Sequence, residues 1–213
     1  MGRVIEYAPP NGRGPIVIVL SGVNGPDAYR RYSANIARLG YYVVLLDGHT
    51  VSFSQYGEDD MREVIEQAQR SPKALPGKVA VIGFSLGGGA AITHASRMPD
   101  LVSAAVAYYP VTSRVQDMKS FAARIKVPTL VLAGENDTYL NCCLIQYARD
   151  MEAAAKEAGA PFELVAYPNV THAFNLKTYS RGLYKTETAD AWQRTIKMLR
   201  KYHLFGRGGE LKK

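Results

Sequence analysis

The chain contains, at residues 78–92, the stretch KVAVIGFSLGGGAAI. Its first part is an apolar run of strand length, and its last part is a run of small residues suited to a helix. Between them lies G-x-S-x-G, the pattern of a nucleophile elbow, in which a strained turn projects the serine oxygen from the backbone. We therefore predict Ser85 as a nucleophile and the backbone N–H of Leu86 as an oxyanion donor.

Glycine-rich turns after strands also bind phosphate, but this one lacks the residues that phosphate sites use. The P-loop requires Lys and then Ser or Thr after its last glycine, and no Lys follows here. The dinucleotide fingerprint requires glycine where Ser85 stands. Because G-x-S-x-G also arises by chance, the assignment depends on partners for Ser85 elsewhere in the chain.

Strand-like and helix-like segments alternate along the rest of the sequence. Apolar runs of strand length lie at 16–20, 42–46, 78–82, 103–108, 129–133 and 162–167. Helical spacing relates Tyr29, Tyr32, Ile36 and Leu39; Met61, Val64, Ile65 and Ala68; Leu140, Leu144, Tyr147, Met151 and Ala154; and Ala189, Trp192, Ile196 and Leu199. This alternation predicts an α/β fold with a mostly parallel central sheet flanked by helices. We expect a single domain over residues 1–205 and a flexible basic tail over 206–213.

The composition is that of an ordinary globular protein, with a formal charge of +7 on 213 residues. Residues 194–213 hold seven cations and one acid, a net charge of +6, so the remaining 193 residues carry only +1. No recognition motif accompanies this basic end, so we expect no nucleic-acid partner. The longest aliphatic run, 16–20, is too short to span a bilayer and lacks the arrangement of a signal peptide, so we expect no membrane partner.

The two cysteines, Cys142 and Cys143, are neighbours in the chain. Neighbouring cysteines rarely bridge each other, and their spacing is not that of metal ligands. We therefore expect free thiols, no bound metal and a reducing, cytoplasmic location.

A serine nucleophile requires a histidine base and a carboxylate that orients it, each following a later strand. Asp137 lies in the turn after the run 129–133, with Glu135 as its rival, and a helix N-cap is the structural alternative for Asp137. His172 follows the run 162–167 and is the predicted base. The other histidines fit this chain order of nucleophile, acid and base less well; they are His49, His94 and His203.

The loop after the first long strand is the expected source of a second oxyanion donor. In this loop we expect the N–H of Val23 to be that donor, with Gly22 next and an ordinary glycine turn as the alternative. Candidate walls of the substrate pocket are Gly22, Phe53, Tyr56, Tyr108, Tyr109 and Phe174, although the aromatic ones are equally suited to the core.

With these residues in place, the chain resembles the dienelactone hydrolase family within the α/β-hydrolase fold. The resemblance rests on the segments Ser21–Gly25, Tyr41–Asp47, Gly83–Gly89, Gly134–Asp137 and Tyr167–Phe174. It covers residues 15–203 and implies an eight-stranded sheet or a shortened version, no cofactor, and hydrolysis of esters or lactones.

Two positions depart from the family pattern. Members of the family that this chain resembles carry cysteine as the nucleophile, with a glutamate in the oxyanion loop, whereas this chain has Ser85 and no acid in 21–25. The family's substrate-binding arginine falls on Leu176, beside Lys177. The sequence therefore favours a serine hydrolase of carboxylic esters or lactones.

A small peptidase or acyltransferase on the same triad is the main alternative, and a non-catalytic binding protein is a third. Fewer than twenty residues separate the run 103–108 from Pro128, too few for a large lid domain. We expect an open site for small or medium acyl groups and a monomer or homodimer.

Overall fold

The computed structural model describes residues 4–51, 53–54 and 56–203, so the predicted tail lies outside the described residues. Within these residues, seven strands form one sheet in the order β1-β3-β2-β4-β5-β6-β7. Their bounds are β1 Ile5–Tyr7, β2 Ile16–Leu20, β3 Tyr42–Leu46, β4 Val79–Phe84, β5 Val102–Tyr108, β6 Thr129–Gly134 and β7 Phe162–Tyr167. β1 pairs antiparallel with β3, and every other pair is parallel. The predicted α/β fold with a mostly parallel sheet is confirmed.

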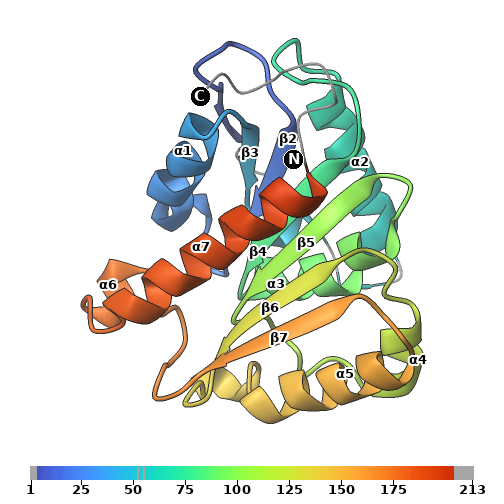
Figure 1. Cartoon of the computed structure of the whole chain (residues 1–213), viewed down its shortest axis with the longest axis vertical. Coiled ribbons are helices and arrows are strands. Elements are labelled where there is room, and N and C mark those ends of the chain that lie inside the picture. Colours follow the sequence, from blue (N-terminus) through green and yellow to red (C-terminus); the bar gives the residue numbers. More distant parts are fainter. Residues whose placement is uncertain (1–3, 52, 55, 204–213) are drawn as a thin grey trace.

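Helices cover both faces of this sheet (Figure 1). They are α1 Arg30–Arg38, α2 Gly57–Gln69, α3 Leu86–Thr93, α4 Met118–Ala123, α5 Ile145–Glu157, α6 Lys177–Ser180 and α7 Lys185–Tyr202. One core joins α1 and α7 to alternate strand residues such as Val17 and Val19. Their neighbours Ile16 and Ile18 face the opposite way, toward α2 and α3. This two-sided burial explains why the central strands are apolar throughout.

Besides the short helices α4 and α6, which the apolar spacing did not predict, two elements differ from the sequence prediction. The strand β1 was not predicted, because only three residues pair and the middle one, Glu6, is exposed. The helix predicted to include Leu140 and Leu144 begins at Ile145. Leu140 and Asn141 have φ values of 47° and 52°, which a right-handed helix does not allow, and Leu140 is 79% exposed. Leu140 therefore belongs to a surface loop and not to a buried helix face.

The order of the strands creates a topological switch point between β2 and β4. The chain leaves β2 for β3 on one side and leaves β4 for β5 on the other, so the connections from these two adjacent strands run in opposite directions across the sheet. Ligands of open α/β sheets bind at such a switch point. The loops that follow β2, β4, β6 and β7 all open at this edge, and they carry the predicted site residues.

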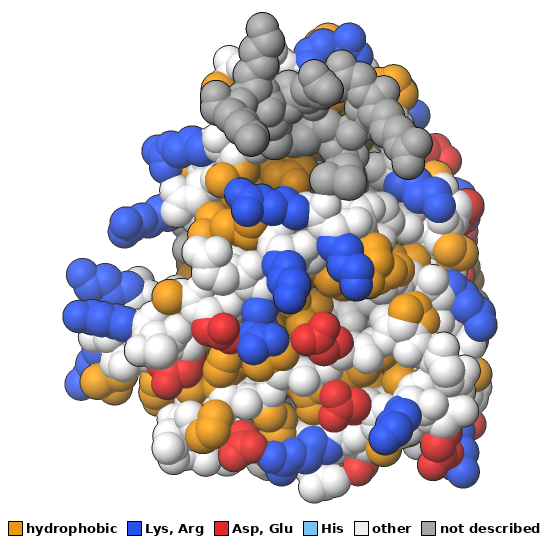
Figure 2. All heavy atoms as spheres, viewed as in Figure 1, with side chains coloured by type: hydrophobic (Ala, Val, Ile, Leu, Met, Phe, Trp, Pro, Cys, Tyr) orange, Lys and Arg blue, Asp and Glu red, His pale blue; other side chains and the backbone are white. Residues whose placement is uncertain are grey.

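The charge of the last helix lies on the surface. The final turns of α7 hold Arg194, Lys197, Arg200 and Lys201, and the Arg194 Nε donates to Asp190 at 2.6 Å. On the face crossed by α7, lysine and arginine side chains are interspersed with acids and apolar groups (Figure 2). Among the helices of the described residues, none combines the length and hydropathy needed to cross a bilayer.

His203 fixes the end of α7 to the sheet. Its ring is 4% exposed, stacks on Tyr41 with centroids 5.7 Å apart, and has Nδ1 2.9 Å from the Ser103 hydroxyl. Ser103 Oγ also contacts the carbonyl of Val79 at 3.1 Å, so this hydroxyl links His203 to β4. Burial lowers the pKa of His203 to about 4.

This buried histidine predicts an acid-sensitive fold. The pKa of an unfolded histidine is about 6.5, so its neutral form stabilises the fold fully above that pH, and this contribution falls as the pH drops. From pH 7 to pH 4 we expect a loss of about 3 kcal/mol in the free energy of unfolding. Urea unfolding at both pH values, for the wild type and for His203→Gln, measures this loss. The variant should lack it, because glutamine does not titrate. An equal loss in both proteins would contradict this assignment.

Candidate active site

Ser85 occupies a strained turn between β4 and α3. Its φ and ψ are 50° and −109°, a region that side-chain-bearing residues rarely adopt. The backbone holds it there, because Ser85 N donates to the Tyr108 carbonyl at 2.9 Å and the Ser85 carbonyl accepts from the amides of Gly89 and Val111. This turn places Ser85 at the end of β4, beside the first turn of α3.

Glycine is required on both sides of this turn. A Cβ added to Gly83 would overlap the carbonyl oxygen of Gly87, and one added to Gly87 would lie 2.5 Å from the carbonyl oxygen of Leu20. Both clashes are with backbone atoms, which cannot move aside as a flexible side chain can. The two glycines of G-x-S-x-G therefore serve the packing of the turn.

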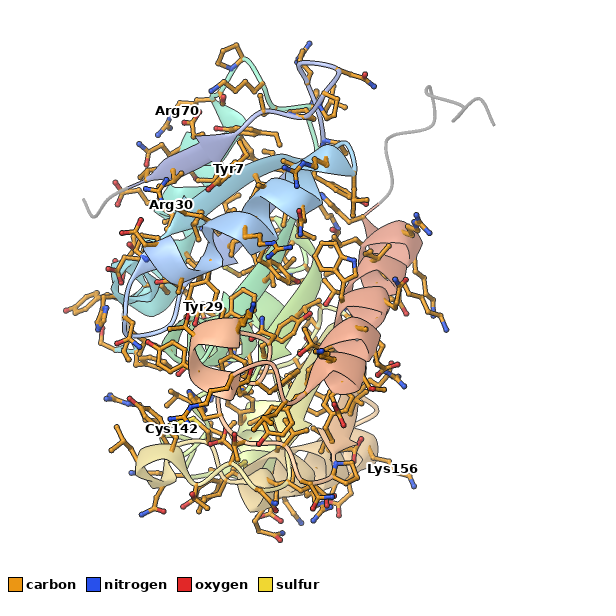
Figure 3. All side chains as sticks on the ribbon, turned by 90° about the vertical axis from the view of Figure 1, so that its left-hand side faces the viewer. Tyr7, Tyr29, Arg30, Arg70, Cys142 and Lys156 are labelled. Carbon is orange, nitrogen blue, oxygen red and sulfur yellow. A yellow bond between two sulfur atoms is a disulfide. The ribbon has the colours of Figure 1, made fainter. Side chains whose placement is uncertain are left out.

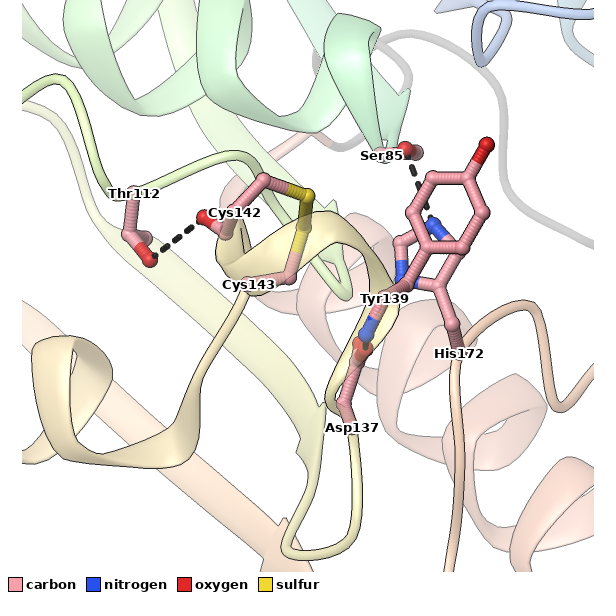
Figure 4. Close-up of a disulfide and its surroundings, with 7 residues drawn as sticks. All are labelled: Ser85, Thr112, Asp137, Tyr139, Cys142, Cys143 and His172. Carbon is pink, nitrogen blue, oxygen red and sulfur yellow. Dashed lines mark hydrogen bonds and ion pairs between the residues drawn. A yellow bond between two sulfur atoms is a disulfide. The ribbon is translucent and has the colours of Figure 1, made fainter.

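Three of the predicted side chains lie in one series of hydrogen bonds (Figure 4). His172 Nε2 is 3.0 Å from Ser85 Oγ, and His172 Nδ1 is 2.7 Å from Asp137 Oδ2. Asp137 is 2% exposed, and its other oxygen accepts from the Tyr139 amide at 3.1 Å. With a proton on Nδ1, the imidazole donates to Asp137 and its Nε2 is free to accept the serine proton.

The loops that carry Asp137 and His172 are hydrogen-bonded to each other. Asn136 N donates to the Val170 carbonyl at 3.0 Å, and Glu135 N donates to the Tyr167 carbonyl at 3.0 Å. A Cβ added to Gly134 would overlap the same Val170 carbonyl, so glycine permits this close approach. The carboxylate and the imidazole are thereby held by two adjacent strands, β6 and β7.

Two tyrosines hold the imidazole plane from different sides. The Tyr139 ring stacks on His172 with centroids 4.5 Å apart and an interplanar angle of 11°. The buried Tyr109 meets His172 edge-on at 4.7 Å and donates its hydroxyl to Asn175 Oδ1 at 2.7 Å. These contacts restrict rotation of the imidazole. Tyr139 was not predicted, because the only signal in the sequence is its position two residues after Asp137.

The other candidates for acid and base lie elsewhere. The carboxylate of Glu135 pairs with Arg149. The His49 side chain is 61% exposed, with Nδ1 2.8 Å from Asp47, and His203 anchors α7. His94 is buried at the end of α3.

The predicted oxyanion loop packs directly against the serine turn. Gly87 N donates to the Ser21 carbonyl at 3.1 Å, and a Cβ added to Gly22 would lie 3.3 Å from Ser85 Cβ. The Leu86 amide stands at the first position of α3. Among the described residues, neither Leu86 nor Val23 donates its backbone N–H to a protein group. Both amides therefore lack a protein acceptor in the described part of the chain, as the prediction of oxyanion donors requires.

Tyr29, whose spacing in the sequence indicates only a helix face, is a neighbour of this loop. Its hydroxyl would lie 2.8 Å from a Cβ on Gly22, and its ring stacks on Phe84. Burial raises the pKa of Tyr29 to about 12, against the lowering effect of hydrogen bonds with Tyr109 and the Gly22 amide. Tyr29 is therefore a neutral hydroxyl at physiological pH. Figure 3 shows Tyr29 and Cys142 on the same side of the molecule.

The remaining pocket candidates spread over several regions. Tyr108 and Phe174 are each 1% exposed in the core, and they line a cavity of about 680 Å³ formed with residues of α1, α6 and α7. Phe53 lines a second cavity, of about 470 Å³, with residues of α3 and the segment 111–117. Tyr56 is 62% exposed ahead of α2. Gly22 and Tyr109 are the candidates that adjoin Ser85 and His172.

Cys142 and Cys143 form a disulfide, so the expectation of free thiols is wrong. The turn that precedes them has two left-handed residues, Leu140 and Asn141. The Cys142 carbonyl then accepts from the amides of Thr112 and Ser113 at 2.9 and 3.1 Å, which holds the loop against the segment after β5. In this tight turn the two neighbouring sulfur atoms meet.

Comparison with known proteins finds a matching family and several relatives of this chain. Residues 47–203 match the family model described as the dienelactone hydrolase family. Protein usf of Aquifex pyrophilus is 32% identical over 128 residues, which cover 60% of this chain and 52% of that protein. The carboxymethylenebutenolidase of Rhodococcus opacus is 26% identical over 216 residues, covering 92% of this chain and 84% of that protein.

The fold is shared with solved structures. A Klebsiella pneumoniae protein, provisionally assigned as a dienelactone hydrolase, superimposes with a TM-score of 0.75 at 21% identity. The match covers 94% of this chain and all of the other. The chain spans about half the length of the first curated relatives that it matches, with 52%, 47% and 57% coverage of the first three.

Proposed function

Because this chain belongs to the dienelactone hydrolase family, we propose that it hydrolyses carboxylic esters or lactones with Ser85 as the nucleophile. The observation that carries the proposal is the unbroken series from Ser85 Oγ through the His172 ring to Asp137. A buried carboxylate beside the imidazole stabilises the imidazolium that forms when the serine proton is transferred.

The reaction has two half-reactions. His172 Nε2 takes the Ser85 proton as the oxygen attacks the ester carbonyl, and the amides of Leu86 and Val23 stabilise the resulting oxyanion. His172 then gives the proton to the leaving alcohol, and an acyl-serine remains. Water attacks the acyl group with His172 again as base, which releases the acid and regenerates Ser85.

The surroundings of the site favour a neutral acyl group over an anionic one. Leu176, at the position of the family's arginine, is 8% exposed and packs in the core. Lys177 beside it belongs to the 680 Å³ cavity, whose lining includes neither Ser85 nor His172, so this cation is not placed at the reacting carbonyl. Between β5 and β6 the only helix of the described chain is α4, with six residues, which supports the expectation of an open site. We therefore propose short- or medium-chain esters and lactones as the substrate class.

A fluorophosphonate probe tests the nucleophile directly. We expect one covalent adduct on the tryptic peptide that contains Ser85, found by mass spectrometry, because the activated oxygen attacks phosphorus as it attacks a carbonyl. The same probe should leave Ser85→Ala unlabelled. Turnover of p-nitrophenyl acetate then shows that the acyl-enzyme is hydrolysed. An unlabelled Ser85 in the folded protein would overturn the proposed function.

A further inference from the structure

The disulfide lies directly beside the proposed triad. The side chains of Asp137, Cys143 and His172 each place a potential ligand atom within 4.8 Å of the other two. Asp137 and Cys143 are 2% and 4% exposed, and the His172 side chain is 14% exposed. Figure 4 shows these residues around the disulfide. The spacing of the cysteines in the sequence could not indicate this group, because it is assembled from two loops.

The three atoms are an oxygen, a nitrogen and a sulfur, which is a donor set that suits Zn²⁺. Zinc takes carboxylate, imidazole and thiolate ligands at about 2.0–2.3 Å, usually in a tetrahedron. Donor atoms in a tetrahedron of that size lie about 3.3–3.8 Å apart. The hydrogen-bonded Asp137–His172 pair, now 2.7 Å apart, would separate slightly and the sulfur would move in, so small side-chain movements would fit the group around one ion. Sites with three protein ligands leave the fourth position to water.

The disulfide prevents this coordination, because a ligating cysteine must be a thiolate. Two molecules of a thiol can open the bond. The first attacks one sulfur and forms a mixed disulfide, and the second releases that sulfur as a thiol. The two thiols are oxidised to their own disulfide, and Cys142 and Cys143 gain the two electrons and two protons.

We propose that Asp137, Cys143 and His172 form an inhibitory Zn²⁺ site in the reduced protein, and that the Cys142–Cys143 disulfide keeps the ion out. On binding, the Cys143 thiol releases its proton. A metal on Nδ1 moves the ring proton to Nε2, and a metal on Nε2 occupies that nitrogen. In either case, His172 can no longer accept the Ser85 proton.

The ion has a short route to this site. Tyr139, whose ring covers His172, is 40% exposed, and the next residue, Leu140, is 79% exposed. The loop that places Tyr139 over His172 is thus at the surface, so the cluster lies directly beneath a solvent-exposed loop. Only the loss of turnover rests on the proposed function; the binding of zinc does not.

Two matched variants test the proposal. Cys142→Ser and Cys143→Ser both abolish the disulfide, so any effect of losing the bond is common to both. Only Cys142→Ser keeps the sulfur that faces Asp137 and His172. We expect it to bind Zn²⁺ about 100-fold more tightly than Cys143→Ser in calorimetric titrations, because the latter lacks one of three ligands. With Co²⁺ as the probe, only Cys142→Ser should show a thiolate-to-metal charge-transfer band.

Turnover supplies the second measurement. Zn²⁺ should inhibit Cys142→Ser and the phosphine-reduced wild type, but neither the oxidised wild type nor Cys143→Ser at the same concentration. Equal zinc affinity in the two variants, or no cobalt–thiolate band in Cys142→Ser, would overturn the inference. A variant that shows the band but hydrolyses no ester without metal would instead count against the proposed function.

Discussion

His172→Ala is expected to lower kcat for p-nitrophenyl acetate by about 10⁶-fold, the scale seen when a triad base is removed. The reason is that His172 Nε2 lies 3.0 Å from Ser85 Oγ, where it can accept the serine proton. Alanine leaves a neutral hydroxyl, which is a poor nucleophile at physiological pH. The oxyanion donors remain, so a small residual rate over the uncatalysed reaction should persist.

The matched control for this change is His49→Ala. His49 is also a histidine after a strand, but its side chain is 61% exposed and pairs with Asp47. We expect the kcat of His49→Ala to stay close to that of the wild type. Initial rates of ester hydrolysis by both variants measure the difference. If the two variants lost activity equally, or if His172→Ala kept most of its activity, the base would have to be another group.

Asp137→Asn is expected to lower kcat by about 10⁴-fold with little change in KM, the scale known for the equivalent change in a serine triad. An amide facing His172 Nδ1 can donate its own N–H, which favours the tautomer with the proton on Nε2. That tautomer cannot accept the serine proton. Because Asp137 acts through His172, the split between kcat and KM separates this positioning role from a loss of substrate binding.

Glu135→Gln is the control for Asp137, since both carboxylates follow β6. The Glu135 side chain pairs with Arg149 and has no hydrogen bond to His172 among the described contacts. We expect kcat to be nearly unchanged. Thermal unfolding of both variants checks that each is folded; a large loss in Glu135→Gln with an intact Asp137→Asn would reverse the assignment of the acid.

Regular patterns made most of the fold predictable. The apolar runs marked six of the seven strands in the described chain. Five of these, β2 to β6, are buried almost throughout, which requires apolar residues on both faces. β1 was missed because three residues with an exposed centre carry too little periodicity. The predicted start of α5 lies too early in the chain because Leu140 continues the apolar spacing of the helix. The left-handed turn at 140–141 leaves no signal in side-chain polarity.

The site was predictable where it follows from topology. Ser85, Asp137 and His172 were chosen because each follows a strand at the same edge of the sheet, and the structure brings these three together. Contacts between loops were not predictable in this way. The stacking of Tyr139 on His172 and the disulfide depend on the path of the turn at 139–143, which residue types alone do not determine.

The position of β7 has a consequence for how this protein would lose activity on warming. β7 is one of the two edge strands of the sheet, and most of its residues are only partly buried, whereas β4 is buried throughout. Amide hydrogens in such outer strands exchange through local openings that cost less free energy than global unfolding. The loop after β7 carries His172, and its hydrogen bonds hold the loop of Asp137. The acid and the base would therefore separate from Ser85 in one sub-global opening, while β2, β4 and β5 still protect their amides.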